Sequence, residues 1–210
     1  MQKRNIKKTI KEYWKKFWNL LWKDDSLKGW IFSVVFLFIF IKLIFFPILN
    51  LTTGTSLPLA IVESCSMYHE GNFFSNFDSW WDEKGEKYEK FNLTKENFLD
   101  YKFKKGFNKG DILFIVGTPA EKLKIGDVIV FQAPKKNPII HRIMKIEITA
   151  TGEKVFSTIG DNNEGQLSIE KNIPEDAIIG RAVFRLAPYV GWIKLIFFEP
   201  LKSPSERGFC

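Results

Sequence analysis

Apolar residues follow different spacings in successive parts of the chain. In residues 6–23 they recur at roughly helical intervals, and lysines fill many of the positions between them. This pattern predicts an amphipathic helix that lies on a membrane surface or docks on a partner protein. From Trp30 to Leu49 the chain is predominantly apolar and carries one charge, Lys42. A helix of that length rises about 30 Å, the thickness of a bilayer's hydrocarbon core, so we expect a membrane-spanning helix over residues 29–50.

Two other interpretations of residues 29–50 are less favoured. One is a buried core helix, but a domain as small as residues 51–210 rarely surrounds a helix that is apolar on every face. The other is a cleavable signal peptide, whose apolar region has about 7–15 residues followed by small ones. The run here is longer, although small residues do occur in the LTTGTS sequence after it.

After residue 110 the pattern changes to short runs rich in β-branched residues. The runs read DILFIV, DVIVFQA, PIIHRIMKIEIT, KVFSTIG and AIIGRAVFRLA, and they are separated by Gly, Pro, Asn or Asp. They predict a mainly β domain, a barrel or sandwich, with a hairpin turn at residues 151–153. Residues 189–201 are apolar but too short to span a membrane, and we expect a last strand or an interfacial segment there.

Residues 71–109 lack strand alternation and are rich in aromatic, Asn, Lys and Glu residues. They predict a partly helical insertion with short helices over residues 78–90 and 94–104, the second supported by a weak capping signature of Thr94 and Asn97. The aromatic residues of the insertion either contact lipid or substrate or cover a small core of their own. They are Phe73, Phe74, Phe77, Trp80 and Trp81.

Positive charge is concentrated at one end of the chain. Residues 1–28 carry nine Lys or Arg against three acidic residues, a net of +6, and Lys42 adds +1 to give the total of +7, so residues 51–210 are neutral overall. A neutral folded domain argues against nucleic-acid binding. The positive-inside rule predicts that the basic arm, residues 1–28, is cytoplasmic and that residues 51–210 lie outside. Two cysteines are too few for a disulfide scaffold or a four-cysteine zinc site, and two histidines argue against a histidine-rich metal centre, so we expect no metal and no cofactor.

Three residues far apart in the sequence have the chemistry of a nucleophilic hydrolase. They are Ser66 soon after the apolar segment, His141 in a predicted strand and Asp161 in a Gly-Asp-Asn-Asn turn. A serine hydroxyl is a poor nucleophile until a base takes its proton, and imidazole is the usual base because it titrates near neutral pH. A carboxylate can then fix the imidazole tautomer. None of the three is a strong signal alone.

The motifs around these residues resemble those of a known family. In order they are Ser-x-Ser-Met after the apolar segment, the strand starts KGDIL and IGDVIVF, then IHRI, GDNN, IGRA and PYVGW. Over roughly residues 60–195 this order is similar to that of type I signal peptidases, in the branch found in archaea and the endoplasmic reticulum. The resemblance implies a membrane-anchored serine endopeptidase that removes signal peptides from exported precursor proteins.

The resemblance also implies a role for each matching residue. Ser66 is the nucleophile, and His141, which stands where the bacterial branch has a lysine, is the general base. Asp161 orients His141, and the Ser64 hydroxyl helps the backbone N–H of Ser66 to form the oxyanion hole. Met67 packs beneath the nucleophile.

The sequence departs from the family pattern at three positions. Cys65 replaces a small residue, often Gly, between the two serines, and we expect it to be buried and unreactive. His69 stands where a proline is usual, and we expect it to cap a turn. Leu167 replaces a second acidic residue, for which Glu164, taken as a possible accessory acid, or Glu170 could substitute.

The implied partners are signal-peptide-bearing precursors, the lipid bilayer and the secretion translocon, with no nucleic acid. The implied location is the plasma membrane, or the endoplasmic-reticulum membrane in a eukaryote. Two alternatives remain at this stage. One is a non-catalytic anchored β-domain, which the loss of an acid at Leu167 favours. The other is a self-cleaving, repressor-like serine peptidase, although such proteins are cytoplasmic and use a Ser–Lys pair.

Overall fold

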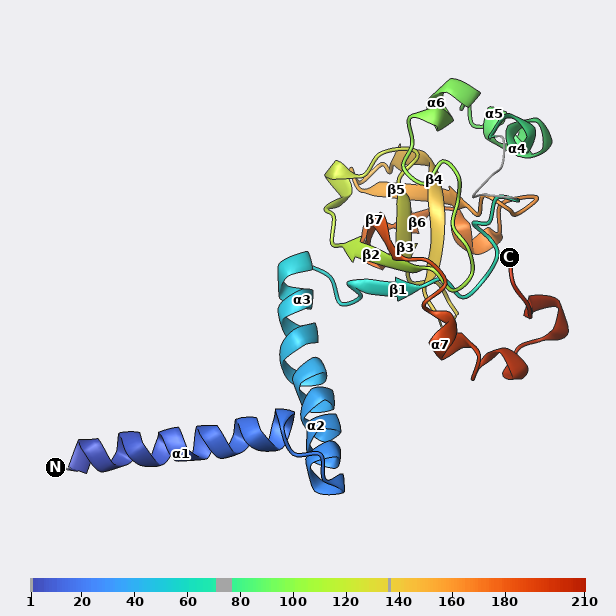
Figure 1. The fold of residues 1–210 in the computed structure, drawn as a ribbon. Helices are drawn as coiled ribbons and strands as arrows, with labels where there is room; N and C mark the ends of the chain where they lie inside the picture. Colours follow the sequence, from blue (N-terminus) through green and yellow to red (C-terminus); the bar gives the residue numbers. More distant parts are fainter. Residues whose placement is uncertain (1, 71–76, 136) are drawn as a thin grey trace. The chain divides into compact units, whose positions relative to one another are not determined.

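A computed structural model describes residues 2–70, 77–135 and 137–210 (Figure 1). It divides into two compact units, one that extends to Thr52 and one that runs from Thr53 to Cys210. The first unit is helical and the second is mainly β. The predicted fold class, a mainly β domain with one apolar helix near the N-terminus and a partly helical insertion, is confirmed.

The first unit consists of α1 (Gln2–Trp22) and a long helical run. The run comprises α2 (Leu27–Phe40), the π-helical turn η1 (Ile41–Phe45) and α3 (Phe46–Thr53). At its start the Ser26 hydroxyl accepts a hydrogen bond from the backbone N–H of Gly29, which caps the helix. The run has 27 residues, and it is long and apolar enough to cross a membrane. It extends beyond both ends of the predicted segment 29–50.

Pro47 lies inside this helical run instead of ending it. A proline lacks the N–H that would bond to the carbonyl four residues earlier, and its ring crowds that carbonyl. The π-helical turn η1 occupies the residues just before Pro47. A wider turn of this kind accommodates a proline, so the helix continues through α3.

The second unit is built on one curled antiparallel sheet (Figure 1). The predicted runs form five of its strands, and β1 and β6 are additions that the sequence pattern did not reveal. Among the described residues the order across the sheet is β1-β2-β7-β3-β4-β5-β6. The strands are β1 (Leu59–Ile61), β2 (Ile112–Val116), β3 (Val128–Phe131), β4 (Ile139–Ile148), β5 (Lys154–Ile159), β6 (Ile173–Pro174) and β7 (Ile178–Ala187). The predicted turn at residues 151–153 joins β4 to β5.

Strand β3 explains why a continuous apolar run can be a strand. Its side chains point alternately to the two faces of the sheet. Val128 and Val130 belong to one buried cluster, and Ile129 and Phe131 belong to another. Both faces of the sheet are therefore covered at β3, and every residue of this strand is buried.

The two Gly-Asp motifs begin strands in the same way. Gly110 and Gly126 both have φ near +90°, a conformation that L side chains rarely adopt. The aspartate after each glycine accepts a hydrogen bond from the backbone N–H three residues before it, at Asn108 and Lys124. The repeated motif is therefore a turn that directs the chain into β2 and towards β3.

The insertion contains short helices that cover one face of the sheet. They are α4 (Phe77–Lys84), α5 (Glu86–Glu89) and α6 (Lys95–Leu99), and the predicted Thr94–Asn97 capping box is present. The aromatic residues of these helices form a buried cluster with Met144 of β4 and Ile159 of β5. Trp80 and Trp81 thus cover a core, as the second interpretation expected, whereas Phe73 and Phe74 lie outside the described residues.

The segment after β7 is helical, so the strand predicted for residues 189–201 is wrong. Tyr189 has φ of 58°, and its N–H donates to Asp111, which turns the chain away from the sheet. A short helix, α7 (Trp192–Leu195), follows. The 3-10 turns of the unit are η2 (Ala120–Lys122), η3 (Ser168–Glu170), η4 (Glu175–Ala177), η5 (Glu199–Leu201) and η6 (Pro204–Glu206).

Candidate active site

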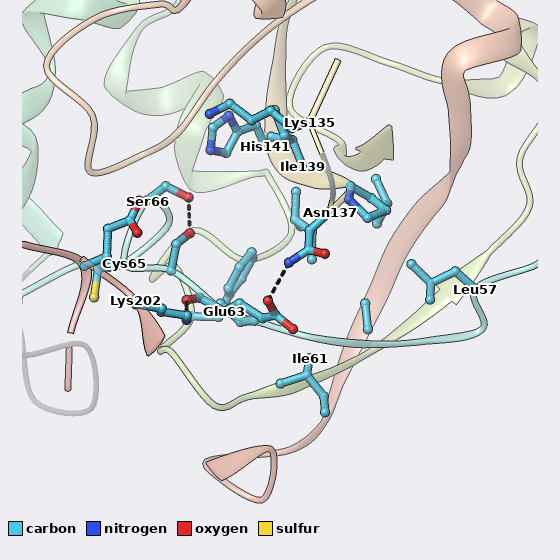
Figure 2. A pocket seen from close by; sticks show the side chains of 18 of the residues that line it. Leu57, Ile61, Glu63, Cys65, Ser66, Lys135, Asn137, Ile139, His141 and Lys202 are labelled. Carbon is cyan, nitrogen blue, oxygen red and sulfur yellow. Dashed lines mark hydrogen bonds between the residues drawn. The ribbon is translucent and has the colours of Figure 1, made fainter. Parts of the chain in front are cut away.

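Ser64 and Ser66 lie on a turn that follows β1 and borders a pocket of about 750 Å³. The pocket lies between residues 57–66 on one side and Lys135 with residues 137–141 on the other (Figure 2). The Ser64 and Ser66 hydroxyl oxygens are 3.1 Å apart. Ser66 and His141 lie towards one end of the pocket, and Leu57 lies at the other (Figure 2).

The backbone around Ser66 is fixed by the Gly-Asp-Asn-Asn turn. The carbonyl of Ser66 accepts from the N–H of Asn162 at 2.8 Å, and the carbonyl of Cys65 accepts from the Asn162 side chain at 3.1 Å. On the other side, the carbonyl of Met67 accepts from the N–H of Phe107 at 3.0 Å. Met67 itself is buried. These bonds hold the Ser66 hydroxyl at the pocket wall.

His141 lies in β4, opposite Ile129 of β3, and its ring is buried except where it lines the pocket. Its Nδ1 atom is hydrogen-bonded to the carboxylate of Glu170. Glu170 is buried, and its other oxygen accepts from the backbone N–H of Leu167 at 2.6 Å. Because Nδ1 is engaged, Nε2 is the ring nitrogen available for proton transfer with a group in the pocket.

Asp161 does not contact His141, which corrects the expected pairing. Its carboxylate accepts from His69 Nε2 at 3.0 Å, from the Tyr88 hydroxyl at 3.0 Å and from Arg142 at 2.6 and 3.0 Å. His141 and Arg142 are neighbours on a strand, so their side chains point to opposite faces. Asp161 lies on the Arg142 face, and Glu170 lies on the His141 face.

The other expected acid, Glu164, is also placed elsewhere. It is exposed and forms an ion pair with Lys84 of α4 at 2.6 Å. Of the two acids considered as substitutes for the family's second acidic residue, only Glu170 contacts His141. The sequence signal that could have favoured Glu170 is its spacing of three residues from Leu167, which stands where the family has an acid. One turn over residues 167–170 brings the glutamate close to the place of that acid.

Asp161 is the centre of a buried polar network on the insertion side of the sheet. Burial alone would raise the pKa of Asp161, but the charge of Arg142 and the hydrogen bonds from His69 and Arg142 outweigh it and hold this pKa well below its ordinary value. Burial lowers the pKa of His69, whose ring stacks on Trp80 with 3.7 Å between ring centroids. His69 is therefore a neutral donor to an ionised Asp161 at neutral pH.

This network should make the folded unit sensitive to acid. In the folded protein the pKa values of Asp161 and His69 are both lower than in the unfolded chain, where they are about 3.9 and 6.5. Their contributions to the free energy of unfolding are present above those values and are lost as the pH falls. We expect the melting temperature to decline first below about pH 6.5, through His69, and further below about pH 4, through Asp161.

The measurement is thermal unfolding of the detergent-solubilised protein from pH 8 to pH 3, compared with His69→Asn. Asparagine offers a neutral donor but no titrating ring, so the variant should lack the decline that begins near pH 6.5. The wild-type protein and the variant share His141, so the difference between their curves isolates His69. Parallel curves across this range would contradict the assignment.

Cys65 forms a disulfide with Cys210, 145 residues later. The expectation that Cys65 is a buried free residue is therefore wrong: it is half-buried, and its sulfur is bonded. The expected lack of reactivity agrees with the disulfide. A disulfide-bonded sulfur is no nucleophile, so Cys65 does not compete with Ser66. Within the ranges that the structure describes, no group of three or more His, Cys, Asp or Glu residues is placed to hold a metal ion.

No family model matches the chain. The human "Signal peptidase complex catalytic subunit SEC11C" is 34% identical over 100 residues, which cover 43% of this chain and 50% of that protein. The "Signal peptidase complex catalytic subunit SEC11" of the yeast Lachancea thermotolerans is 41% identical over 61 residues, 28% of this chain and 36% of that protein. The protein of the same name in Zygosaccharomyces rouxii is 35% identical over 60 residues, 28% of this chain and 35% of that protein.

The chain spans about half the length, or less, of these relatives. Over that part it is similar to catalytic subunits of signal peptidase complexes. The resemblance to the endoplasmic-reticulum branch of the type I signal peptidases, inferred from the motifs, is confirmed to this extent.

Proposed function

We propose that this chain is a membrane-anchored serine endopeptidase that removes signal peptides from exported precursor proteins. The observation that carries the proposal is the position of Ser66 and His141 in one pocket, with Glu170 on the far nitrogen of the imidazole. The similarity to signal peptidase catalytic subunits supports the substrate class. The activity therefore rests on a Ser–His–Glu arrangement.

The proposed reaction begins when His141 Nε2 takes the Ser66 proton. The Ser66 oxygen then attacks the carbonyl carbon of the scissile peptide bond, and the carbonyl oxygen becomes negatively charged. The Ser66 N–H and the Ser64 hydroxyl, whose oxygen lies 3.1 Å from that of Ser66, stabilise this charge. His141 next gives its proton to the leaving amine, and a water molecule, activated by His141, hydrolyses the acyl-enzyme.

Glu170 and Asp161 have separate roles in this proposal. Glu170 accepts the proton of Nδ1, which fixes the tautomer of His141 and stabilises the imidazolium as it forms. Asp161 anchors the turn whose next residue, Asn162, bonds to the carbonyls of Cys65 and Ser66. It acts through the backbone of the nucleophile, not through the base.

The loss of an acid at Leu167 was the feature that favoured a non-catalytic domain. Because Glu170 occupies the carboxylate position beside His141, that feature no longer supports the alternative. The self-cleaving alternative requires a lysine base. Lysines do line this pocket, but a buried carboxylate, that of Glu170, is bonded to His141, which favours the histidine as the base. A peptidase acting on other proteins is the function that the site supports best.

The experiment that tests the proposal is incubation of the detergent-solubilised protein with a precursor, followed by sequencing of the new N-terminus. We expect one cut at the end of the signal peptide. The family resemblance implies shallow pockets for small side chains, so a Phe just before the cut should stop cleavage, because a side chain too large for the pocket is rejected. Absence of cleavage of any precursor, with the protein folded, would contradict the proposal.

We also infer the orientation of the chain in its membrane. The arm of residues 1–28 carries the excess of positive charge, which favours the cytoplasmic side. The Cys65–Cys210 disulfide supports an oxidising compartment for the second unit, because disulfides rarely persist in the cytosol. The plasma membrane and the endoplasmic-reticulum membrane both satisfy this condition, and a translocon and a subunit complex are the proposed partners there.

The orientation predicts a protease result. Protease added to intact cells that carry the chain in their plasma membrane should digest residues 53–210 and leave the basic arm intact. An epitope tag at each end of the chain reports the outcome on one blot, and detergent-permeabilised membranes, in which both tags are lost, are the control. Protection of residues 53–210 in the intact preparation would reverse the inferred orientation.

A further inference from the structure

Residues 199–210, which we call the strap, pass along the pocket that contains Ser66 and His141. Lys202, Glu206 and Arg207 are among the residues that line this pocket. Lys202 lies towards the same end of the pocket as Cys65 and Ser66 (Figure 2). The catalytic mechanism proposed above uses no residue of the strap.

One anchor of the strap is Lys109, a lysine that is completely buried. Its ammonium group donates to the carboxylate of Glu199 at 2.8 Å and to the carbonyl of Glu206 at 2.7 Å. The same Glu199 oxygen accepts from the N–H of Gly208 at 3.2 Å. Lysines are almost never fully buried unless they are paired, so the burial of Lys109 is costly, and the group is paired directly with two residues of the strap, Glu199 and Glu206.

The other anchors join the strap to the segment that carries the nucleophile. Cys210 is bonded to Cys65, one residue before Ser66. The ammonium group of Lys202 donates to the carbonyl of Glu63 at 2.8 Å. The strap is therefore attached to the Ser64–Ser66 turn from both directions, at Glu63 and at Cys65.

The strap also has internal bonds that fix its shape. The guanidinium group of Arg207 donates to the carbonyls of Lys202 and Pro200, at 2.8 and 2.9 Å. The ring of Phe209 packs on Trp192 of α7 with 4.1 Å between ring centroids. Anchors at both ends, together with these bonds, make the strap a fixed part of the pocket.

We propose that the strap is a wall of the peptide-binding site and determines which polypeptides are bound, with the Cys65–Cys210 disulfide and Lys109 as the anchors that hold it there. The proposal rests on the proposed function, because it concerns the substrate of the same site. Three strap side chains line the pocket, and the proposed mechanism needs none of them to activate Ser66. The strap should therefore affect peptide binding, seen in KM, more than the chemistry at Ser66.

The first test compares the oxidised protein with the double variant Cys65→Ala/Cys210→Ala. Both cysteines are replaced so that no free thiol remains beside Ser66. Two quantities are measured: the KM and kcat for cleavage of a precursor peptide, and the rate at which a small fluorophosphonate labels Ser66. A small probe needs the nucleophile but not the wall, so we expect KM to rise about tenfold, with kcat and the labelling rate changed less than about twofold.

The outcomes separate this proposal from the one on which it rests. An unchanged KM in a double variant that is shown to be folded overturns the strap proposal. An equal fall in the labelling rate and in kcat/KM also overturns it, because the disulfide would then act by positioning Ser66. If the oxidised wild-type protein neither cleaves the peptide nor reacts with the probe, the proposed function fails, and the strap proposal fails with it.

The second test measures the preference for charged peptides. A strap with a merely structural role would not change this preference at one peptide position. Arg207 is exposed and lines the pocket, so Arg207→Glu should reverse its local field without burying a charge. The substrates are pairs of peptides that differ only by Glu or Lys at one position near the cut. For one of these positions we expect the ratio of kcat/KM values to shift about threefold in favour of the Lys peptide. Arg207→Gln is the matched control and should give half the effect or less. A uniform change at all positions, or none, would overturn the assignment.

Discussion

Replacing Ser66 by alanine should lower the rate of precursor cleavage by about 10⁴-fold or more, and His141→Ala should reduce it to nearly the same level. A nucleophile and its base act as one unit, so removing either removes the whole covalent pathway. Ser64→Ala should cost less, about 10²- to 10³-fold, because it removes one hydrogen-bond donor to the oxyanion. The measurement is single-turnover cleavage by the detergent-solubilised protein.

The control for Ser66→Ala is Ser56→Ala. Ser56 is exposed and lies before β1, so its substitution should leave the rate unchanged. Each variant is also tested for labelling by a fluorophosphonate, which should disappear for Ser66→Ala and become very slow for His141→Ala. Cleavage that survives Ser66→Ala would refute the serine mechanism at its centre, and a strong effect of Ser56→Ala would show that the assay reports folding.

The two buried carboxylates should respond to substitution in opposite ways. Glu170→Gln keeps the size of the side chain but removes the charge beside His141 Nδ1, and a glutamine can stabilise the wrong tautomer by donating its own N–H. We expect kcat to fall by about 10²- to 10⁴-fold, with the melting temperature changed by only a few degrees. Glutamine can still accept from the N–H of Leu167.

Asp161→Asn should instead mainly destabilise the fold. Arg142 is fully buried, and its charge is neutralised by Asp161. Removing one partner of a buried ion pair leaves an uncompensated charge and costs about 3–5 kcal/mol. For a unit of this size we expect the melting temperature to fall by roughly 10 °C, and the activity of the remaining folded protein to fall less than that of Glu170→Gln.

Measuring kcat and thermal unfolding on both variants distinguishes the two roles. The control is Glu164→Gln, at an exposed acid paired with Lys84, which should change neither quantity much. If Asp161→Asn lost kcat at an unchanged melting temperature while Glu170→Gln stayed active, Asp161 would be the partner of His141 during catalysis. The bonding observed in the structure would then describe a state other than the active one.

Local patterns in the sequence were sufficient for most of the architecture. The apolar run around residues 29–50 determines a helix that needs no tertiary partner, because its length and composition alone suit a bilayer. The five predicted strands were found because alternation and turn residues are local properties. Strands β1 and β6 were missed because they have only three and two residues, too few for a period to be seen.

The chemistry of the site was determined by the sequence only in part. The order of motifs singled out Ser66 and His141, and strand alternation required His141 and Arg142 to face opposite sides. Alternation cannot say which carboxylate arrives at each face. That depends on the path of residues 160–170 past the edge of the sheet, and this path placed Asp161 with Arg142 and brought Glu170 to His141.

The disulfide and the strap are the features that only the tertiary structure decided. Two cysteines in 210 residues carry no information about whether they pair, since pairing requires their Cα atoms to come within about 7 Å. The fold brings the Cα atoms of Cys65 and Cys210 to 5.8 Å. Lys109, whose burial no local pattern indicates, bonds to Glu199 and Glu206 of the segment that ends in Cys210. The sequence determined which residues could react, and long-range packing decided which of them meet.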